Sequence, residues 1–202
     1  MPGGTDVVHL QGLPLAHATR AAKRLQLPCV LDNCDSWARL TWSQRRQAGA
    51  RKTAYNLGAA VFTLLRAARY ADIVTYISAD DLKIDSALLR GSATAVLRNR
   101  YDPRLLGLPR GDVRLRRELL TVADFSYQPN LLGLQWALRE VWPQLERVTW
   151  TLHGPSQPEL DLPAGVTYRG FAADLLDLYA PDRIAFVPLL SGSGVKNKVL
   201  EA

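Results

Sequence analysis

The stretch Ile184-Ala-Phe-Val-Pro-Leu-Leu190, followed at once by Ser191-Gly-Ser-Gly194, decides the fold class of this chain. An apolar run of strand length, a glycine turn and an expected helix start near Val195 are typical of a parallel sheet wrapped by helices. Gly192 and Gly194 let backbone N–H groups approach a ligand, and the helix points its positive dipole end at the same place. The stretch favours an anion as ligand, although an ordinary strand-to-helix connection with a serine cap fits the same residues.

The rest of the chain alternates strands and helices in the same way. Short apolar runs predict strands, and apolar residues at helical spacing predict helices. This alternation indicates an α/β fold with parallel sheets. Strands are expected over residues 6–10, 28–32, 73–77, 94–97, 118–123, 148–152, 166–169 and 184–188, and helices over residues 15–25, 42–70, 79–89, 130–145 and 172–179.

A change of pattern in the middle of the chain suggests two domains. Between Arg100 and Arg117 the period is lost, and proline and glycine gather among arginines, as in a linker. The 202 residues are enough for one large domain or two small ones. We expect an N-terminal domain over residues 1–107 and a C-terminal domain over residues 108–202.

Composition narrows the class of protein. The net charge of +6 comes mostly from arginine, which suits phosphate-bearing ligands, nucleic acid or an anionic membrane surface. Cys29 and Cys34 form neither a disulfide framework nor a metal-ligand pattern, so reduced thiols are expected. The sequence shows no secretory signal and no membrane span. The predicted location is the cytoplasm.

Three stretches, in order, resemble nucleotide-sugar glycosyltransferases of the family 4-like, GT-B type. They are residues 123–132, residues 165–179 and the final Gly192-Ser-Gly-Val-Lys-Asn-Lys-Val-Leu-Glu-Ala202, which is the most specific. Residues 72–81 and 99–102 resemble the end of that family's N-terminal domain. The resemblance implies an α/β fold with two Rossmann-like domains, both partial, because family members extend further at both ends.

The same resemblance implies an activity. Members transfer a sugar from a nucleoside-diphosphate sugar to an acceptor with retention of configuration, in a cleft between the two domains. The partners implied are this donor and an unknown glycan, lipid or other acceptor, with no further cofactor and no metal. The expected donor-binding residues are Gly170, Phe171, Gly192, Ser193, Gly194, Val195, Lys196, Lys198 and Glu201.

Two lysines are candidates for stabilising the diphosphate leaving group, which is the main electrostatic task in such a reaction. On one helix Lys196 and Lys198 cannot share a face, so one of them is expected to reach the ligand, and Lys198 is also a candidate catalytic residue. Relatives carry cations in the turn that here spans residues 124–130, and this sequence has none there. One of the two lysines would have to supply the missing positive charge. The competing interpretation is that both lysines are solvated at the surface.

Of the two acidic positions in the family pattern, this sequence keeps one and replaces the other. Glu201 matches the second acid, which in relatives binds the ribose hydroxyls, and a carboxylate can accept two hydrogen bonds from a diol. Ser193 stands where the first acid would be, which puts the usual contact to the donor sugar in doubt. By resemblance, Gly170 and Phe171 flank the nucleobase, with Gly154 a weaker candidate; a glycine that merely ends a strand is the alternative.

On the acceptor side, Asp35 follows a predicted strand and is a candidate catalytic group, although aspartate also serves as a helix cap or turn residue. His9, His17 and His153 lack partners at ligand spacing, so no metal site is expected. A short region mixes aromatic and basic residues, which suits the edge of an anionic bilayer or simply a solvated helix face. Its members are Trp37, Arg39, Trp42, Arg45, Arg46, Arg51 and Lys52.

Two other functions stay open. Ser193 and the missing outer segments are compatible with a nucleotide-binding remnant that no longer transfers sugar. A nucleic-acid-binding protein is the second alternative, but no recognised module supports it and no nucleic-acid partner is expected. If the outer segments are absent, the cleft is incomplete and slow turnover is expected, because the reacting sugars are not held in register. An uncovered sheet edge would also favour self-association.

Overall fold

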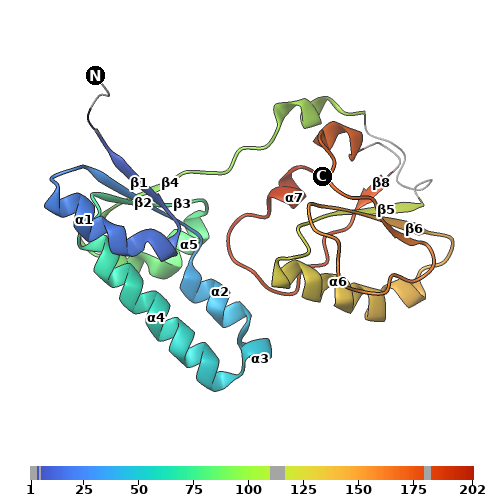
Figure 1. The fold of residues 1–202 in the computed structure, drawn as a ribbon, viewed down its shortest axis with the longest axis horizontal. Helices are drawn as coiled ribbons and strands as arrows, with labels where there is room; N and C mark the ends of the chain where they lie inside the picture. The colour runs from blue at the N-terminus through green and yellow to red at the C-terminus, as the bar shows by residue number, and fades with distance from the viewer. Residues whose placement is uncertain (1–3, 5, 110–116, 180–182) are drawn as a thin grey trace. The chain divides into compact units, whose positions relative to one another are not determined.

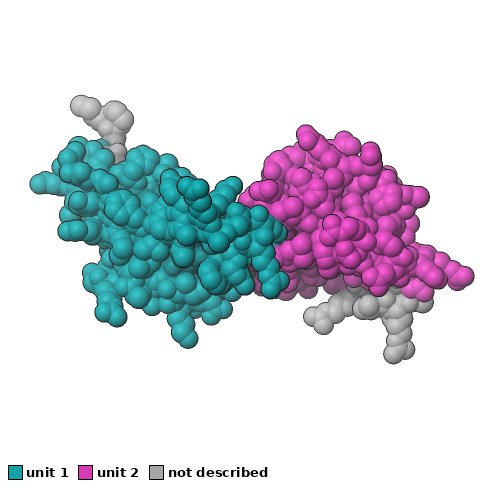
Figure 2. Space-filling model, turned by 90° about the horizontal axis from the view of Figure 1, so that it is seen from below, with its two compact units in different colours: residues 1–99, 191–195 teal, residues 100–190, 196–202 magenta. Residues whose placement is uncertain are grey.

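The computed structural model of the chain describes residue 4 and residues 6–109, 117–179 and 183–202. It divides into two units, coloured separately in Figure 2. Unit 1 comprises Met1–Asn99 with Ser191–Val195, and unit 2 comprises Arg100–Leu190 with Lys196–Ala202. Of the linker expected over residues 100–117, residues 110–116 lie outside the described residues. Each unit has its own parallel sheet and its own apolar core.

Unit 1 is built on a four-stranded parallel sheet in the order β1-β2-β3-β4. Its register aligns Val30 of β2 with His9 of β1 and with Ile73 of β3, and Ile73 in turn with Ala93 of β4. This sheet confirms the parallel arrangement that the alternation of strands and helices predicts. The strands are β1 (Val8–Gln11), β2 (Cys29–Cys34), β3 (Ile73–Tyr76) and β4 (Ala93–Val96).

Two serine caps begin helices just after strands of this sheet. The Oγ of Ser36 accepts the N–H of Arg39, and the Oγ of Ser78 accepts the N–H groups of Asp80 and Asp81. Such caps satisfy N–H groups that have no partner within the helix. The helices of unit 1 are η1 (Leu13–Ala18), α1 (Thr19–Arg24), α2 (Trp37–Ser43), α3 (Arg45–Ala48), α4 (Ala50–Ala68), α5 (Ala79–Asp85) and η2 (Ser86–Leu89).

The long helical region expected over residues 42–70 is helical in the structure, but it is divided among three helices. The chain begins its helical course earlier, at Trp37, and is interrupted at Gln44 and again at Gly49. Gly49 has a φ of 77°, which lies outside the helical range and which glycine adopts at little cost. The chain therefore turns at Gly49, and α4 begins anew at the next residue.

The core of unit 1 lies between this sheet and its helices. Leu31 and Val74 are fully buried in the two central strands, and Leu64 of α4 packs into the same cluster. Figure 1 shows α4 beside α2, and the two helices are in contact. Both helices come after β2 in the chain. The residues between β2 and α2 therefore lie at the carboxyl end of the sheet.

Unit 2 has a second four-stranded parallel sheet, in the order β7-β6-β5-β8. Its register aligns Leu119 of β5 with Trp150 of β6 and Ile184 of β8, and Trp150 with Val166 of β7. A non-sequential order of this kind requires the chain to cross over the sheet, as in Rossmann-like domains. The strands are β5 (Glu118–Val122), β6 (Thr149–His153), β7 (Val166–Tyr168) and β8 (Arg183–Ala185).

The helices of unit 2 depart from expectation at two places. No α-helix forms over residues 172–179, where the structure has a single 3-10 turn, η6. Arg183 donates from Nη1 to the carbonyls of Asp177 and Leu178, which a longer helix would use itself. The helix expected near Val195 begins at Asn197, because the backbone of the preceding residue, Lys196, is still extended. The helices are η3 (Pro103–Gly107), α6 (Gln128–Glu140), η5 (Trp142–Gln144), η6 (Leu175–Asp177) and α7 (Asn197–Leu200).

The core of unit 2 is centred on Trp150, which is almost fully buried in β6. Its indole Nε1 donates to Thr121 Oγ1 at 2.9 Å, so the polar atom of the ring is satisfied. The rings of Trp142 and Phe186 pack against it. A side chain at Gly133 of α6 would overlap the Pro188 carbonyl, so this glycine lets the helix approach the segment after β8 closely.

Both cysteines are free thiols. Burial and the nearby Asp32 carboxylate raise the pKa of Cys34 to about 11, so this thiol is protonated at neutral pH. None of the helices in the described part of the chain has the length and apolar content required to traverse a bilayer.

Candidate functional site

At the carboxyl end of β2, polar side chains are buried rather than exposed. Asn33 and Ser36 are almost completely buried, and the chain turns sharply because Cys34 adopts a φ of 59°. The Ser36 hydroxyl donates to Asp85 Oδ1 at 2.8 Å while accepting the N–H of Arg39. Ser36 thus joins the start of α2 to the end of α5.

Asp85 is the innermost acid of this cluster, with an exposed fraction of 1%. Its carboxylate accepts hydrogen bonds from Ser36 and from the Tyr76 hydroxyl, at 2.8 and 2.9 Å. Burial raises the pKa of Asp85, and the two hydrogen bonds offset part of this rise. The pKa of Tyr76 is also raised, chiefly by burial and then by the charge of Asp85. Tyr76 and Asp85 therefore form a buried, hydrogen-bonded pair in the core of unit 1.

Asp81, one turn earlier on α5, is fully buried and connects three segments of the chain. Its Oδ1 lies 3.3 Å from Nη1 of Arg39, and its Oδ2 accepts the backbone N–H of Gly194 at 2.9 Å. A buried carboxylate needs such partners, because its desolvation is otherwise costly. Asp81 therefore fixes the glycine loop to α2 and α5.

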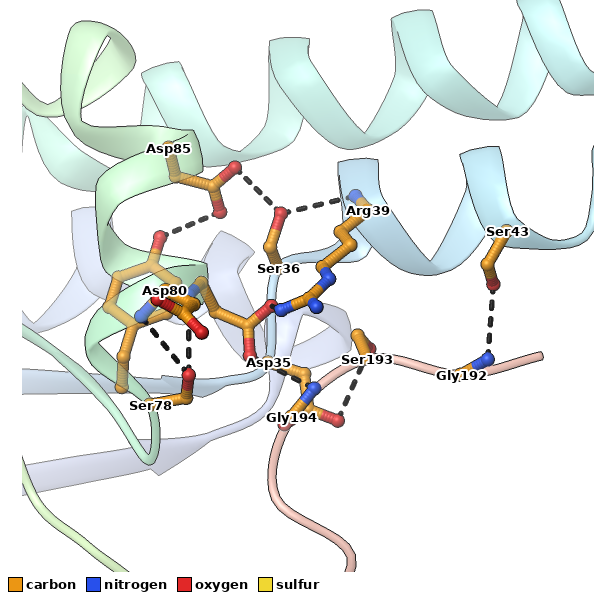
Figure 3. A network of polar contacts seen from close by, with 12 residues as sticks. Asp35, Ser36, Arg39, Ser43, Ser78, Asp80, Asp85, Gly192, Ser193 and Gly194 are labelled. Carbon is orange, nitrogen blue, oxygen red and sulfur yellow. Dashed lines mark hydrogen bonds and ion pairs between the residues drawn. The ribbon is translucent and has the colours of Figure 1, made fainter. Parts of the chain in front are cut away.

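Figure 3 shows the loop Ser191–Val195 lying against this cluster. The N–H of Gly192 donates to Ser43 Oγ at 3.1 Å, and Ser193 Oγ donates to Asp35 Oδ2 at 3.3 Å. A side chain at Gly194 would overlap the Asp35 carboxylate. The structure thus brings together four residues singled out by the sequence, namely Asp35, Gly192, Ser193 and Gly194.

The donors of this loop already bind oxygen atoms of the protein. Gly194 points its N–H at Asp81, and Gly192 points its N–H at Ser43. A phosphate would have to replace both oxygen atoms and approach two carboxylates of like charge, which is unfavourable. In this arrangement the loop is better suited to hydroxyl groups, such as those of a sugar, than to a diphosphate.

In unit 2, the predicted residue Lys198 lies at the carboxyl end of β5. Lys198 Nζ donates to Asn130 Oδ1 at 3.0 Å, and Asn130 Nδ2 donates to the carbonyl of Asp124 at 2.7 Å. Asn130 lies in the first turn of α6, directly after the loop that follows the strand. The lysine therefore supplies a positive charge next to residues 124–130, which contain no cation of their own.

The charge of Lys198 is influenced by two neighbours. Burial lowers its pKa first and the charge of Lys196 lowers it further, while the Glu201 carboxylate raises it. Burial, and to a smaller extent the same carboxylate, raise the pKa of Tyr179 to about 12. Glu201 and Lys198 are therefore close enough to interact electrostatically, at opposite ends of the short helix α7.

Gly154 and Gly170 meet at the carboxyl ends of β6 and β7. The N–H of Gly154 and the ring Nδ1 of His153 both lie 3.1 Å from the Gly170 carbonyl. Burial lowers the pKa of His153, which favours its neutral form. Phe171, the next residue along, is 75% exposed and so offers a free aromatic face. These loops can flank a flat group such as a base.

Several residues of these clusters were not predicted from the sequence. Asp81, Asp85 and Tyr76 in unit 1 were assigned no role, and neither was Asn130 in unit 2. Arg39 was singled out only as a member of the basic and aromatic region. One signal was available: Ser78 followed three residues later by Asp81 is a helix-capping pattern. It locates the start of α5, but not the partners from α2 and from the loop at residue 194.

Within residues 4, 6–109, 117–179 and 183–202, no group of three His, Cys, Asp or Glu side chains is arranged to hold a metal ion. The Gly194 loop and the Lys198 cluster are grouped with different units, so the predicted donor-binding residues do not all belong to one of them. Gly192, Ser193, Gly194 and Val195 belong to unit 1, and Gly170, Phe171, Lys196, Lys198 and Glu201 belong to unit 2.

Comparison with known proteins gives a fold but no family. The sequence matches no family model and no curated protein. Among solved structures, a sucrose-phosphate synthase from Thermosynechococcus elongatus is similar with a TM-score of 0.70 and 15% identity, over 98% of this chain and 53% of that one. A UDP-glucosyltransferase from Polygonum tinctorium, capable of glucosylating indoxyl, has a TM-score of 0.41 and 10% identity, over 90% of this chain and 53% of that one.

The TM-score of 0.41 is too low to establish a common fold with the UDP-glucosyltransferase. At 15% identity, the similarity to the synthase shows the fold alone. The two four-stranded parallel sheets and their flanking helices agree with it. The chain spans about half the length of the synthase. It has the α/β fold of GT-B type, with two Rossmann-like units, over that part.

Proposed function

We propose that this chain carries the donor-side chemistry of a retaining, family 4-like glycosyltransferase, which moves a sugar from a nucleoside-diphosphate sugar to an acceptor. The fold it shares with a protein named sucrose-phosphate synthase supports sugar transfer as the class of reaction. Retention of configuration and membership of family 4 rest on the sequence resemblance of residues 123–132, 165–179 and 192–202.

One observation carries the proposal, namely the contact of Lys198 with Asn130 at the first turn of α6. The thirteen residues of α6 place a positive dipole end beside the loop after β5. Ligands of open α/β sheets bind at the carboxyl ends of the strands. An ammonium group and a helix N-terminus at that edge together suit a diphosphate.

Within this proposal, each predicted residue has a physical task. Lys198, assisted by Lys196, stabilises the negative charge that develops on the departing diphosphate. Glu201 accepts hydrogen bonds from the ribose diol. Gly170 and Phe171 flank the base.

The loop in unit 1 would serve the sugars. Ser193, flanked by Gly192, Gly194 and Val195, offers a hydroxyl where the family has an acid, and Asp35 accepts its hydrogen bond. We assign to Asp35 the orientation of an acceptor hydroxyl, which a carboxylate can achieve by accepting the hydroxyl proton.

A second candidate is nucleotide binding without transfer. It is favoured by the contacts of Gly192 with Ser43 and of Gly194 with Asp81, because these occupy the N–H groups that the sequence pattern assigns to the ligand. The two candidates agree on the binding of a nucleotide by unit 2 and differ only in turnover.

Titration calorimetry with UDP, GDP and ADP tests the shared part. Lys198→Met should weaken the preferred nucleotide roughly 10- to 100-fold, the worth of a charge-assisted hydrogen bond. Lys83→Met, at an exposed position on α5, is the matched control and should leave affinity unchanged. Absence of nucleotide binding by the parent, or an equal loss in the control, would remove the basis of the proposal.

Turnover then separates the two candidates. With the nucleotide identified, the corresponding nucleotide sugars are incubated with candidate acceptors, and the anomeric configuration of the product is read by NMR. Retained configuration supports transfer by the family 4-like mechanism. Nucleotide binding with no transfer to any acceptor, and no release of nucleotide from the sugar donor, would leave the binding protein as the function.

A further inference from the structure

The helices that follow β2 carry an unusual charge distribution. Residues 36–71 contain seven cations and no aspartate or glutamate. Arg39 pairs with the buried Asp81. Among the described residues, the other six cations of this region pair with no carboxylate; they are Arg45, Arg46, Arg51, Lys52, Arg66 and Arg69.

The outward face of α4 is aromatic where a solvated helix would be polar. Tyr55 and Phe62 are 76% and 64% exposed, and Leu65 is also exposed. Seven residues apart on one helix, Tyr55 and Phe62 share a face. The buried positions of α4 lie on the opposite side and are Thr53, Ala60, Leu64, Ala67 and Ala68.

Cations flank this aromatic strip at both ends. Arg51 precedes Tyr55 by four residues, and Arg66 and Arg69 follow Phe62 by four and seven, so all three share its face. The neighbouring α2 and α3 add Trp42, which is 56% exposed, and Arg45, whose guanidinium lies 4.8 Å from the centre of the Trp42 ring. We call this surface the basic aromatic face; it consists of Trp42, Arg45, Arg46, Arg51, Lys52, Tyr55, Phe62, Leu65, Arg66 and Arg69.

A groove runs alongside the basic aromatic face. Between η1, α2 and α4 it has a volume of about 480 Å³ and largely apolar walls, including Leu13, Trp37 and Leu40. A second hollow of about 240 Å³ shares His17 and Thr63 with it and is lined by Arg20, Phe62 and Arg66. An apolar groove next to a hollow lined by two arginines is complementary to a lipid, which has an apolar chain and an anionic head group.

We propose that the basic aromatic face of unit 1 is a docking surface for an anionic lipid bilayer. Aromatic and leucine side chains enter the interfacial layer, and arginine and lysine bind the anionic head groups. This inference is independent of the proposed sugar transfer, since it uses none of the residues assigned to it.

Charge complementarity decides between a bilayer and two other occupants. A second copy of the chain, seated by twofold symmetry, would bring six unpaired cations against six others, which is repulsive. A nucleic acid would satisfy the arginines and could stack its bases on the aromatic rings, but it would leave the apolar groove without a partner. A bilayer satisfies both at once.

Vesicle co-sedimentation tests the proposal on the full chain. We expect it to sediment with vesicles of phosphatidylcholine containing about 30 mol% phosphatidylglycerol, and to stay in solution with phosphatidylcholine alone. Binding should fall as salt rises from about 0.05 M to about 0.5 M, because screening weakens the attraction to head groups. Equal binding to both vesicle types, or none to either, would overturn it.

Variants locate the surface. Tyr55→Ser with Phe62→Ser, and separately Arg66→Gln with Arg69→Gln, should each reduce partitioning about tenfold or more. Lys83→Gln with Arg139→Gln removes the same charge from exposed positions elsewhere and should bind like the parent. Circular dichroism and unfolding midpoints verify that each variant folds. Equal loss in the control pair would mean that net charge alone, and not this face, causes binding.

The other occupants are outcomes of the same test. If sedimentation velocity without lipid shows a dimer that Tyr55→Ser with Phe62→Ser converts to a monomer, the face is an interface between copies and the proposal is wrong. It is equally wrong if a single-stranded RNA oligonucleotide displaces the protein from anionic vesicles and its binding depends on the same arginines.

Discussion

The loops at the carboxyl ends of the two parallel sheets carry opposite charge. In unit 1 the acids Asp81 and Asp85 are buried and fully engaged by hydroxyl, guanidinium and backbone donors. In unit 2 the cluster is basic and only partly buried, with Lys198 held by one amide side chain. The same topological position has thus become a structural anchor in one unit and a candidate ligand site in the other.

The contrast between a structural anchor in unit 1 and a ligand site in unit 2 is tested most strongly at Asp81, where we expect the largest loss of stability. Asp81→Ala leaves the Gly194 N–H and the Arg39 guanidinium without their acceptor, and should lower the free energy of unfolding by about 2–4 kcal/mol. Asp80→Ala, at the exposed neighbouring position, should cost less than about 1 kcal/mol. Urea denaturation of both variants measures the difference. Equal losses would show that the acid cluster does not anchor unit 1.

Glu201 sharpens the other half of the comparison. Glu201→Gln should weaken a ribonucleotide by about 1.5–3 kcal/mol, the worth of a charge-assisted hydrogen bond to the ribose. A 2′,3′-dideoxynucleotide, which lacks the diol, should bind the parent and the variant equally in calorimetry. If both ligands lose the same affinity, Glu201 acts on the phosphates or on folding instead.

A substitution at Gly194 has a smaller expected effect. This glycine contributes by leaving room for the Asp35 carboxylate against the loop. Gly194→Ala introduces a side chain at a φ of 68° that overlaps Asp35. Gly91→Ala, at a φ of 88° with open space around it, isolates the backbone cost of about 1–2 kcal/mol. We expect Gly194→Ala to be destabilised by about 1 kcal/mol more in thermal or urea unfolding. No difference would mean that the loop is not seated on Asp35.

The smallest effect concerns the proton on Asp85. Because the folded-state pKa of Asp85 is raised, the protonated form stabilises the fold below the ordinary carboxyl pKa of about 3.9, and this contribution is lost as pH rises through the folded value. Asp85→Asn cannot titrate, so the parent should become less stable relative to it as pH increases from 4 to 7. Urea unfolding at several pH values measures this; a flat or rising difference contradicts it.

The sequence predicts the sheets of this protein well and the polar clusters only in part. Strands such as Ile73–Tyr76 and Glu118–Val122 are apolar runs with local signatures, so they can be located within a residue or two. The helix expected over residues 172–179 is wrong because Arg183 occupies the carbonyls that would extend it, a contact that apolar spacing cannot reveal. The break at Gly49 carries a signal, but a lone glycine is also tolerated within helices.

The site shows the same limit. Lys198 and Glu201 were singled out through a motif contained in eleven consecutive residues, whereas the partner of Lys198 is 68 residues away. Asp81 and Gly194 are 113 residues apart, and neither position suggests the other. Burial turns an aspartate that reads as an ordinary helix cap into the acceptor for a distant loop, and only the folded chain determines which loop that is.

The attachment of Ser191–Val195 to unit 1 has a consequence for the order in which the protein folds. Unit 1 is discontinuous: its last contacts, from Ser193 to Asp35 and from Gly194 to Asp81, span 158 and 113 residues. Residues 6–99 leave the ribosome before residues 191–195 are made, so the nascent unit at first lacks the hydrogen bonds that this loop makes to Asp35 and Asp81. The entropic cost of closing a loop rises by only about 0.6 kcal/mol for each doubling of its length, so this long loop costs little more than a shorter one. The cost is therefore chiefly one of time, because unit 1 is complete only after residues 191–195 have been synthesised.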